Sequence, residues 1–216
     1  MSERSSAPPN LAASLPPSLS TPGWKGGPCL ELVREFNEGF LELLSHTARL
    51  DGARALPEFV RVHRGAWLAL DAAARARAAQ CPFLLADIHY RNPAWWQWAS
   101  GKGIRPPRTT GPPGLFSSKL AVEVMYEALV LTWHTTRLNP RVAATLFGIS
   151  SQVCEIVASL GLRDLRHLAS HHHRSLRPRW EHLASFWGPL LSASSRENPQ
   201  SLHDLFRHGI QLLDHE

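Results

Sequence analysis

Apolar side chains recur at intervals of three and four residues along two long stretches of this chain, residues 29–50 and residues 120–138. This spacing predicts an amphipathic helix with one broad buried stripe in each stretch. Because each stretch is the longest apolar surface of its half of the chain, we expect the two helices to cross in the middle of the molecule. The apolar positions are Leu30, Leu32, Val33, Phe36, Phe40, Leu41, Leu43 and Leu44 in the first stretch, and Val122, Val124, Met125, Ala128, Leu129, Leu131 and Trp133 in the second.

Capping residues predict the shorter helices. Asn139-Pro140 is a typical helix start and predicts a helix over residues 141–147, which Gly148 ends, and Ser150 can cap a further helix over 151–160. Asn92-Pro93 repeats the start signal before a short aromatic helix at 94–99, and other helices are expected at 71–80, 163–172 and 199–213. Ala, Leu and Arg are abundant, whereas Val, Ile and Thr are too sparse for a large sheet, so the predicted fold class is all-α.

Two parts of the chain resemble each other. His46-Thr-Ala-Arg-Leu-Asp51 aligns with His134-Thr-Thr-Arg-Leu-Asn139 at an offset of 88 residues, and Trp96 aligns with Trp187 at an offset of 91. This self-similarity indicates two tandem copies of a small helical unit, which we expect to pack as a pseudo-dimer. The expected organisation is a disordered Ser/Pro-rich tail at 1–27, a first helical repeat at 28–99, a Pro/Gly-rich linker at 100–118, and a second repeat with a C-terminal helix at 119–216.

The formal net charge of +5 favours acidic partners, nucleic acid first among them, without identifying one. Cys29, Cys81 and Cys154 are isolated, which argues against a disulfide framework or a zinc ribbon and fits a reducing cytosol. No apolar run approaches the roughly 18 residues of a membrane span, and the N-terminus lacks the basic start and apolar core of a secretory signal. We therefore expect a soluble cytoplasmic protein that does not insert into a membrane.

Residues 142–157 have the spacing of a helix-turn-helix. Such a unit needs small, turn-forming and apolar residues at fixed positions, which are supplied by Ala144, Gly148, Ile149, Cys154 and Val157. The second helix would expose Ser151 and Gln152, and Gln152 could read adenine, but it also carries Glu155 and no Arg or Lys. The alternative is a helical corner that does not touch DNA.

A basic segment follows at residues 163–179. Its arginines are Arg163, Arg166, Arg174, Arg177 and Arg179. Together they could neutralise several phosphates or dock an acidic partner, and the alternative is a solvated helix face that runs into a basic turn.

The remaining chemistry-bearing residues favour neither a metal site nor an enzyme. His167 and His171 share a helix face, but no third ligand is spaced for zinc, so we expect no metal or cofactor. The pairs Asp87/His89 and Glu181/His182 belong to no nucleophile or phosphate motif. The tryptophans at 95, 96, 98, 180 and 187 could stack on bases, but their matching repeat positions favour a place in the core.

Residues 137–181 resemble FlhD, a subunit of the bacterial flagellar transcriptional activator. The resembling positions are Gly148-Ile149, Ala158, Leu160, Leu162, Leu165, Leu168-Ala169 and Arg179-Trp180-Glu181. The resemblance implies an all-α fold, a dimeric core of long helices, and a regulator that acts with a separate DNA-contacting partner. The family's dimer cysteine falls on Leu176, and on Ala86 in the first copy, so a disulfide of that kind cannot form here.

Two functions remain open on these observations. The first is an FlhD-like transcriptional regulator or co-regulator that acts on DNA with a partner protein. The second is a non-enzymatic adaptor or scaffold of a larger assembly, such as a secretion or surface apparatus, without DNA binding. In both cases we expect a protein partner and no small-molecule substrate.

Overall fold

The computed structural model describes residues 27–49, 58–101, 115–116 and 118–215. The expected tail, apart from Gly27, and most of the expected linker lie outside the described residues. In the first half of the chain the elements are α1 (Gly27–Arg49), α2 (Glu58–Val62), α3 (Arg64–Ala69), α4 (Ala72–Ala78), β1 (Ala86–Asp87) and α5 (Pro93–Ala99). In the second half they are α6 (Ser118–Leu138), α7 (Pro140–Phe147), α8 (Ser151–Ala158), α9 (Leu162–His172), the 3-10 turn η1 (His173–Ser175), β2 (Arg177–Pro178), α10 (Ala184–Ser195) and α11 (Pro199–His215). The predicted all-α fold class is confirmed.

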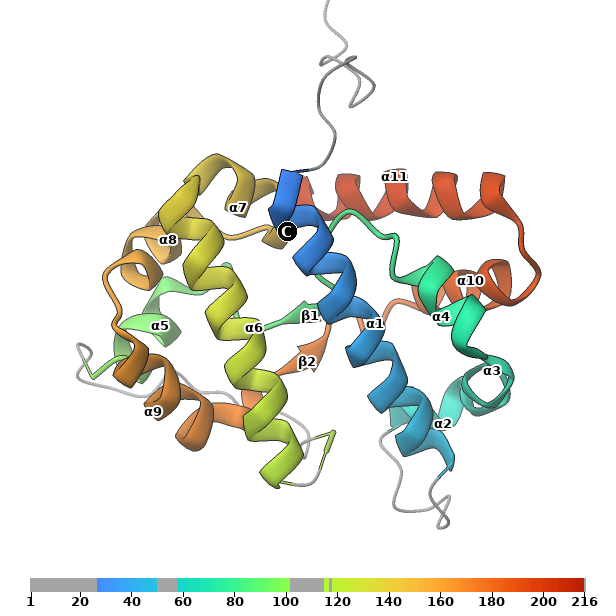
Figure 1. Ribbon diagram of the computed structural model, residues 1–216, viewed down its shortest axis with the longest axis horizontal. Helices are drawn as coiled ribbons and strands as arrows, with labels where there is room; N and C mark the ends of the chain where they lie inside the picture. Colours follow the sequence, from blue (N-terminus) through green and yellow to red (C-terminus); the bar gives the residue numbers. More distant parts are fainter. Residues whose placement is uncertain (1–26, 50–57, 102–114, 117, 216) are drawn as a thin grey trace, which may run out of the picture.

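The two long helices α1 and α6 lie next to each other in the middle of the molecule, as Figure 1 shows. Each one buries one face, and α1 places its apolar residues Leu30, Val33, Phe40, Leu41 and Leu44 inside. Phe40 of α1 meets the ring of Phe116, whose neighbour Leu115 is also buried. Leu115 and Phe116 of the expected linker therefore pack against the core.

Local capping chemistry sets the ends of the short helices. The side-chain oxygen of Asn139 accepts hydrogen bonds from the backbone N–H groups of Arg141 and Val142 at the start of α7. Gly148 ends α7 in the left-handed conformation, with φ of 60°, and the Ser150 hydroxyl caps α8. Asn92 caps α5 in the same way through the N–H of Trp95. These predicted boundaries are confirmed.

A short ribbon joins the two halves of the chain. Strands β1 and β2 pair antiparallel, with Ala86 opposite Pro178 and Asp87 opposite Arg177. The ladder is extended by a hydrogen bond from the N–H of Arg179 to the carbonyl of Leu85. Within the core, the side chain of Asn37 on α1 bonds both the carbonyl of Phe83 and the N–H of Leu85, which fixes the segment leading into β1.

The order of elements is similar in the two halves. In each half a long helix precedes two short helices, a further helix, a two-residue strand and a helix. Helices of one half also pack on helices of the other, since α10 contacts α3 and α4, and α5 contacts α8. This order is what a duplicated unit predicts, and the duplication itself stays a prediction.

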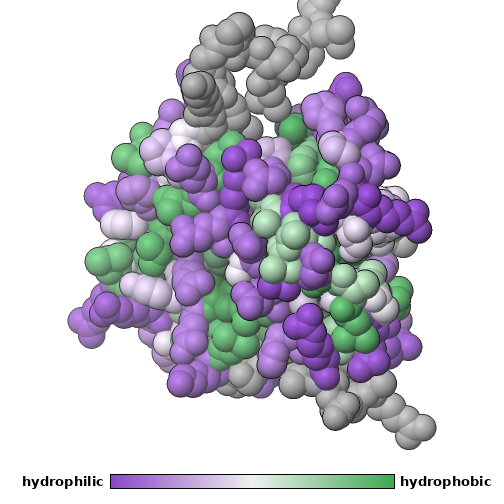
Figure 2. All heavy atoms as spheres, turned by 45° about the vertical axis from the view of Figure 1, so that its right-hand side comes forward, coloured by the Kyte–Doolittle hydropathy of each residue, from purple (hydrophilic) through white to green (hydrophobic). Residues whose placement is uncertain are grey.

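On the face of the molecule that Figure 2 shows, hydrophobic residues lie in small patches among hydrophilic ones.

Aromatic side chains fill the core between the halves. Trp67 of α3 and Phe59 of α2 both contact Trp187 of α10, with ring centroids 5.8 and 5.1 Å apart respectively. Trp95 and Trp96 are also buried, so the predicted core position is confirmed for Trp95, Trp96 and Trp187. Trp98 and Trp180 are half-buried and pack against the core. Within the described part of the chain, no single helix has the length and apolar content of a membrane span. The pair α7 and α8 reaches that length only when joined across a bend of 118°.

Candidate functional site

The corner formed by α7 and α8 has the shape of a helix-turn-helix. The chain bends by 118° between the two helices, within the range of about 90–120° that is typical of this unit. Gly148 makes the turn possible because its positive φ is a conformation that side chains with a Cβ rarely adopt. The geometry expected from the sequence is therefore present.

Helix α8 separates an apolar face from a polar face. Val153, Cys154 and Val157 are buried against the rest of the domain. Ser151 and Gln152 are exposed at the start of the helix, which is the part that enters the major groove in a helix-turn-helix protein.

A hollow of about 420 Å³ lies on the concave side of the corner. Arg141, Ser151 and Glu155 are among the residues that line it. Arg141 is exposed at the second position of α7 and brings a cation to this hollow. It lies outside the basic segment 163–179 and before α8, so the charge pattern of the sequence does not single it out. Since the first helix of the unit crosses the DNA backbone, an arginine at its start is in a position to meet phosphate.

Three of the five arginines of the basic segment are exposed on α9 and η1. These are Arg163, Arg166 and Arg174. The guanidinium of Arg166 lies 6.0 Å from the ring centroid of Tyr126 on α6, and Asp164 is turned back to accept a hydrogen bond from the N–H of Gly161. The acid within the segment is thus engaged in capping α9.

Arg177 is engaged by a carboxylate. Its guanidinium makes a two-point ion pair with Glu181, four residues later, with the Nε to Oε1 bond at 3.0 Å. Both side chains are largely buried, so this arginine has its charge neutralised within the protein.

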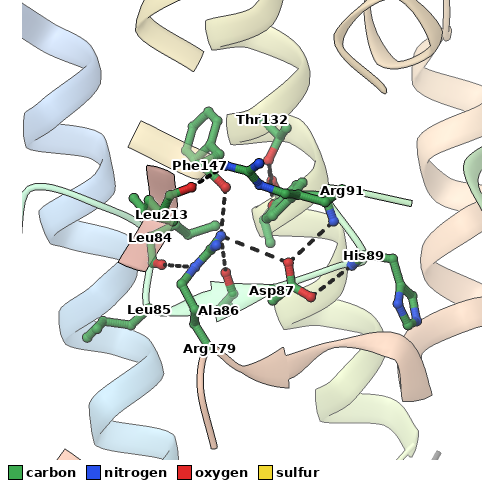
Figure 3. Close-up of polar contacts among 12 residues, drawn as sticks. Leu84, Leu85, Ala86, Asp87, His89, Arg91, Thr132, Phe147, Arg179 and Leu213 are labelled. Atoms are coloured by element: carbon green, nitrogen blue, oxygen red, sulfur yellow. Dashed lines mark hydrogen bonds and ion pairs between the residues drawn. The ribbon is translucent and has the colours of Figure 1, made fainter. Parts of the chain in front are cut away.

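Arg179 lies in the core, and its expected place on an exposed basic surface is wrong. Its side chain is only 1% exposed. Figure 3 shows its guanidinium among backbone carbonyls: Nε donates to Leu84 at 3.0 Å, and Nη2 donates to Phe147 at 2.7 Å and to Ala86 at 3.4 Å. The carboxylate of Asp87, 3.9 Å away, balances the buried charge. Arg179 therefore holds the β1 segment and the end of α7 together.

The histidines of α9 pack against one another and against two tryptophans. Among the residues that the structure describes, no group of three His, Cys, Asp or Glu is arranged to hold a metal ion. His167 and His171 stack on each other with centroids 4.1 Å apart, and His172 packs against Trp95 and Trp98. Burial, and secondly the neighbouring histidines, lower the pKa of His172, which favours its neutral form.

The two acid and histidine pairs have structural partners. Asp87 accepts hydrogen bonds from the backbone N–H groups of His89 and Tyr90 in the turn after β1, and burial lowers the pKa of His89. Glu181 accepts a hydrogen bond from Arg177, and Nε2 of His182 lies 3.5 Å from Oε1 of Glu181. These contacts shape the loops that follow the two strands.

The fold and this corner define the chain as an all-α protein with a helix-turn-helix-shaped unit in its second half. Comparison of the chain with protein-family models, with curated proteins and with solved structures finds no match.

Proposed function

We propose that this protein is a transcriptional regulator or co-regulator that contacts DNA through the α7–α8 corner together with a partner protein. The observation that carries the proposal is the combination of the 118° corner with a solvent-facing start of α8 at Ser151 and Gln152. An exposed glutamine in this position can make a two-point contact with adenine, and Glu155 can accept from the amino group of cytosine. The likeness of residues 137–181 to FlhD supports the same function.

Phosphate contacts would come from the arginines around the corner. Arg141 lies at the start of α7, and Arg163, Arg166 and Arg174 lie on α9 and η1. Four cations can neutralise only about four phosphates, whereas specific DNA binding usually involves more phosphate contacts than that. This small footprint supports a co-regulator whose partner supplies the remaining affinity.

The salt dependence of DNA binding tests the proposal. Duplex fragments are selected from a random library with the untagged full-length protein, and the affinity for the best fragment is then measured between about 50 and 200 mM salt. The triple variant Arg163→Ala, Arg166→Ala, Arg174→Ala should flatten the slope of log K against log salt by about one unit per arginine. A matched control removes three exposed arginines elsewhere, Arg61, Arg196 and Arg207, and should leave the slope unchanged.

Base reading is tested separately from phosphate binding. Gln152→Ala should reduce the preference for the selected fragment over a scrambled one, by about 1–3 kcal/mol, with little change in the salt slope. If the wild-type protein selects no sequence and its weak binding is equal for both arginine triple variants, the DNA proposal is refuted.

A second candidate function is an adaptor that binds proteins only. It is favoured by the chemistry of α8, whose exposed side chains include Glu155 and no cation, and by the engagement of Arg177 and Arg179 inside the domain. Recovery of partners from a cell extract with and without nuclease separates the two functions. Recovery of specific DNA fragments, or of partners that are lost on nuclease treatment, supports the regulator, whereas partners that are indifferent to nuclease and come without specific DNA support the adaptor.

A further inference from the structure

A groove runs between the two long helices α1 and α6, and its lining includes no residue of the α7–α8 corner. It has a volume of about 540 Å³, and its lining among the described residues comes from α1 and α6. Its apolar lining comes from Leu32 and Phe36 on α1 and from Tyr126, Val130 and Leu131 on α6. Leu32 is 40% exposed, although it is a large apolar residue on the otherwise well-buried helix pair. A hollow of this size accommodates a few apolar side chains of a bound molecule.

The groove is acidic, in contrast with the basic chain as a whole. The carboxylates of Glu35 and Glu127 line it, and Glu123 is the third acid of the group. Burial raises the pKa of Glu127, and the charges of Glu123 and Glu35 raise it further, so these carboxylates repel each other. Within the described ranges no ion pair joins any of these three side chains to a cation. Two basic side chains also lie here, His134 in the lining and Arg166 against the ring of Tyr126. Among the described residues neither is ion-paired with the three acids, so a cation of a bound molecule can pair with them.

Backbone chemistry limits the kind of occupant. Both walls are helices, whose backbone N–H and C=O groups are bonded within the helix, so they offer no strand edge to an extended peptide. An occupant must satisfy its own backbone, as an α-helix does, and it can anchor in the groove through apolar side chains spaced at three and four residues.

We infer that the α1–α6 groove binds an amphipathic helix of a partner protein, whose apolar face carries leucine-like anchors flanked by Lys or Arg. The anchors enter the apolar lining, and the flanking cations pair with Glu35, Glu123 and Glu127. The inference rests on the groove and its charge, and it is independent of DNA binding at the α7–α8 corner.

Gly39 offers a way to close the groove without harming the fold. It lies on α1 in the groove lining, and a Cβ added there meets nothing within 4 Å. Gly39→Leu therefore fills the hollow with a side chain, and it replaces a poor helix former with a good one. The melting temperature should rise while binding is lost, which separates blocked docking from unfolding. Gly65→Leu on α3, where a Cβ also meets nothing within 4 Å, is the matched control.

The experiment uses a phage library of random amphipathic 18-residue helices, selected on the full-length protein. Enriched peptides should carry apolar residues at helical spacing with Lys or Arg beside them. The best peptide, labelled with fluorescein, should bind Gly39→Leu at least tenfold more weakly than wild type and bind Gly65→Leu equally well. The triple variant Glu35→Gln, Glu123→Gln, Glu127→Gln should lower its affinity about tenfold in low salt and remove most of the salt dependence.

Several results would overturn the inference. These are an absence of enriched peptides, enrichment without a basic bias, or equal binding to Gly39→Leu and wild type. A concentration-dependent dimer that Gly39→Leu dissociates, seen by light scattering without peptide, would assign the groove to a second copy of the chain instead. Competition by a synthetic peptide of residues 1–26 that binds more tightly than any selected helix would assign it to the protein's own N-terminal segment.

Discussion

The guanidinium of Arg179 donates a 2.7 Å hydrogen bond to the carbonyl oxygen of Phe147, the last residue of α7. The contact links the segment after β2 to the corner that presents α8. One buried side chain thereby determines where the proposed DNA-contacting corner sits relative to the core, although Arg179 itself is inaccessible to a ligand.

Removing this arginine should destabilise the protein strongly. Arg179→Met keeps much of the apolar volume but leaves the carbonyls of Leu84, Ala86 and Phe147 without this donor, and it leaves Asp87 without its counter-charge. We expect a loss of about 3–5 kcal/mol in the free energy of unfolding, measured in urea. Arg174→Met, at an exposed position, should change it by less than about 0.5 kcal/mol. A loss below about 1 kcal/mol in the free energy of unfolding of Arg179→Met would show that water replaces the hydrogen bonds of the guanidinium.

The turn of the corner should tolerate no side chain. A Cβ on Gly148 would lie 2.7 Å from Cδ2 of Leu213 and 3.3 Å from Nη1 of Arg179, at a φ of 60°. Gly148→Ala should therefore cost about 2–4 kcal/mol, from left-handed backbone strain together with displacement of α11. Because Leu213→Ala removes the closest clash, the double variant should be less destabilised than the sum of the two single variants. Strict additivity would mean that strain alone accounts for the loss.

Two helical glycines should respond to alanine with opposite signs. Gly39→Ala on α1 meets open space and should raise the free energy of unfolding by about 0.5–1 kcal/mol through helix propensity. Gly209→Ala on α11 would place its Cβ 2.1 Å from the ring of Phe83, and the resulting displacement should cost about 1–3 kcal/mol. Thermal unfolding of both variants in one buffer is sufficient, and a stabilised Gly209→Ala would contradict the packing of α11 on Phe83.

The acidic groove should make stability depend on pH in a specific direction. Burial, Glu123 and Glu35 all raise the pKa of Glu127, so the folded state binds its proton more tightly than the unfolded state does. Stability therefore falls as pH rises from the ordinary glutamate pKa through the raised folded value. Glu127→Gln should raise the melting temperature at pH 7 and have no such effect at pH 4, with Glu31→Gln as an exposed control. The gain should be roughly a few tenths of a kcal/mol because the side chain is largely hydrated. An equal gain at both pH values would exclude the charge repulsion as its cause.

The sequence predicted those parts of the fold that depend on neighbours along the chain. Asn139 caps the start of α7, Gly148 ends it, and Ser150 caps the start of α8. Each of these residues contacts only the backbone of the adjacent helical turn, so the sequence shows these boundaries. Helices α1 and α6 each bury one apolar stripe, and in the sequence this stripe is recognised from apolar residues at intervals of three and four. Helix α10 was not predicted, because it packs against α3, α4 and α11 and its sequence has little polar periodicity.

The candidate site was predicted only in part, because a charged residue looks the same in sequence whether it is exposed or buried. Arg163 and Arg179 are both arginines of one basic segment, but the carbonyl partners of Arg179 lie 32, 93 and 95 residues away. No local pattern reports such distant acceptors. Arg177 could have been suspected, since Glu181 follows it by four residues. The α1–α6 groove forms only where α1 packs beside α6, and the two helices begin 91 residues apart, at Gly27 and Ser118. Its acidic charge comes from residues of both helices, so no local pattern shows it.

The aromatic contact of Phe59 and Trp67 with Trp187 has a consequence for protein synthesis. Trp187 is made 120 residues after Trp67, which at a synthesis rate of about 5–20 residues per second is a delay of roughly 6–24 s. During this interval the first two aromatic side chains lack the ring that later covers them. The first half of the nascent chain therefore exposes aromatic surface that is prone to aggregation. A chaperone that shields aromatic segments should increase the yield of the full-length chain.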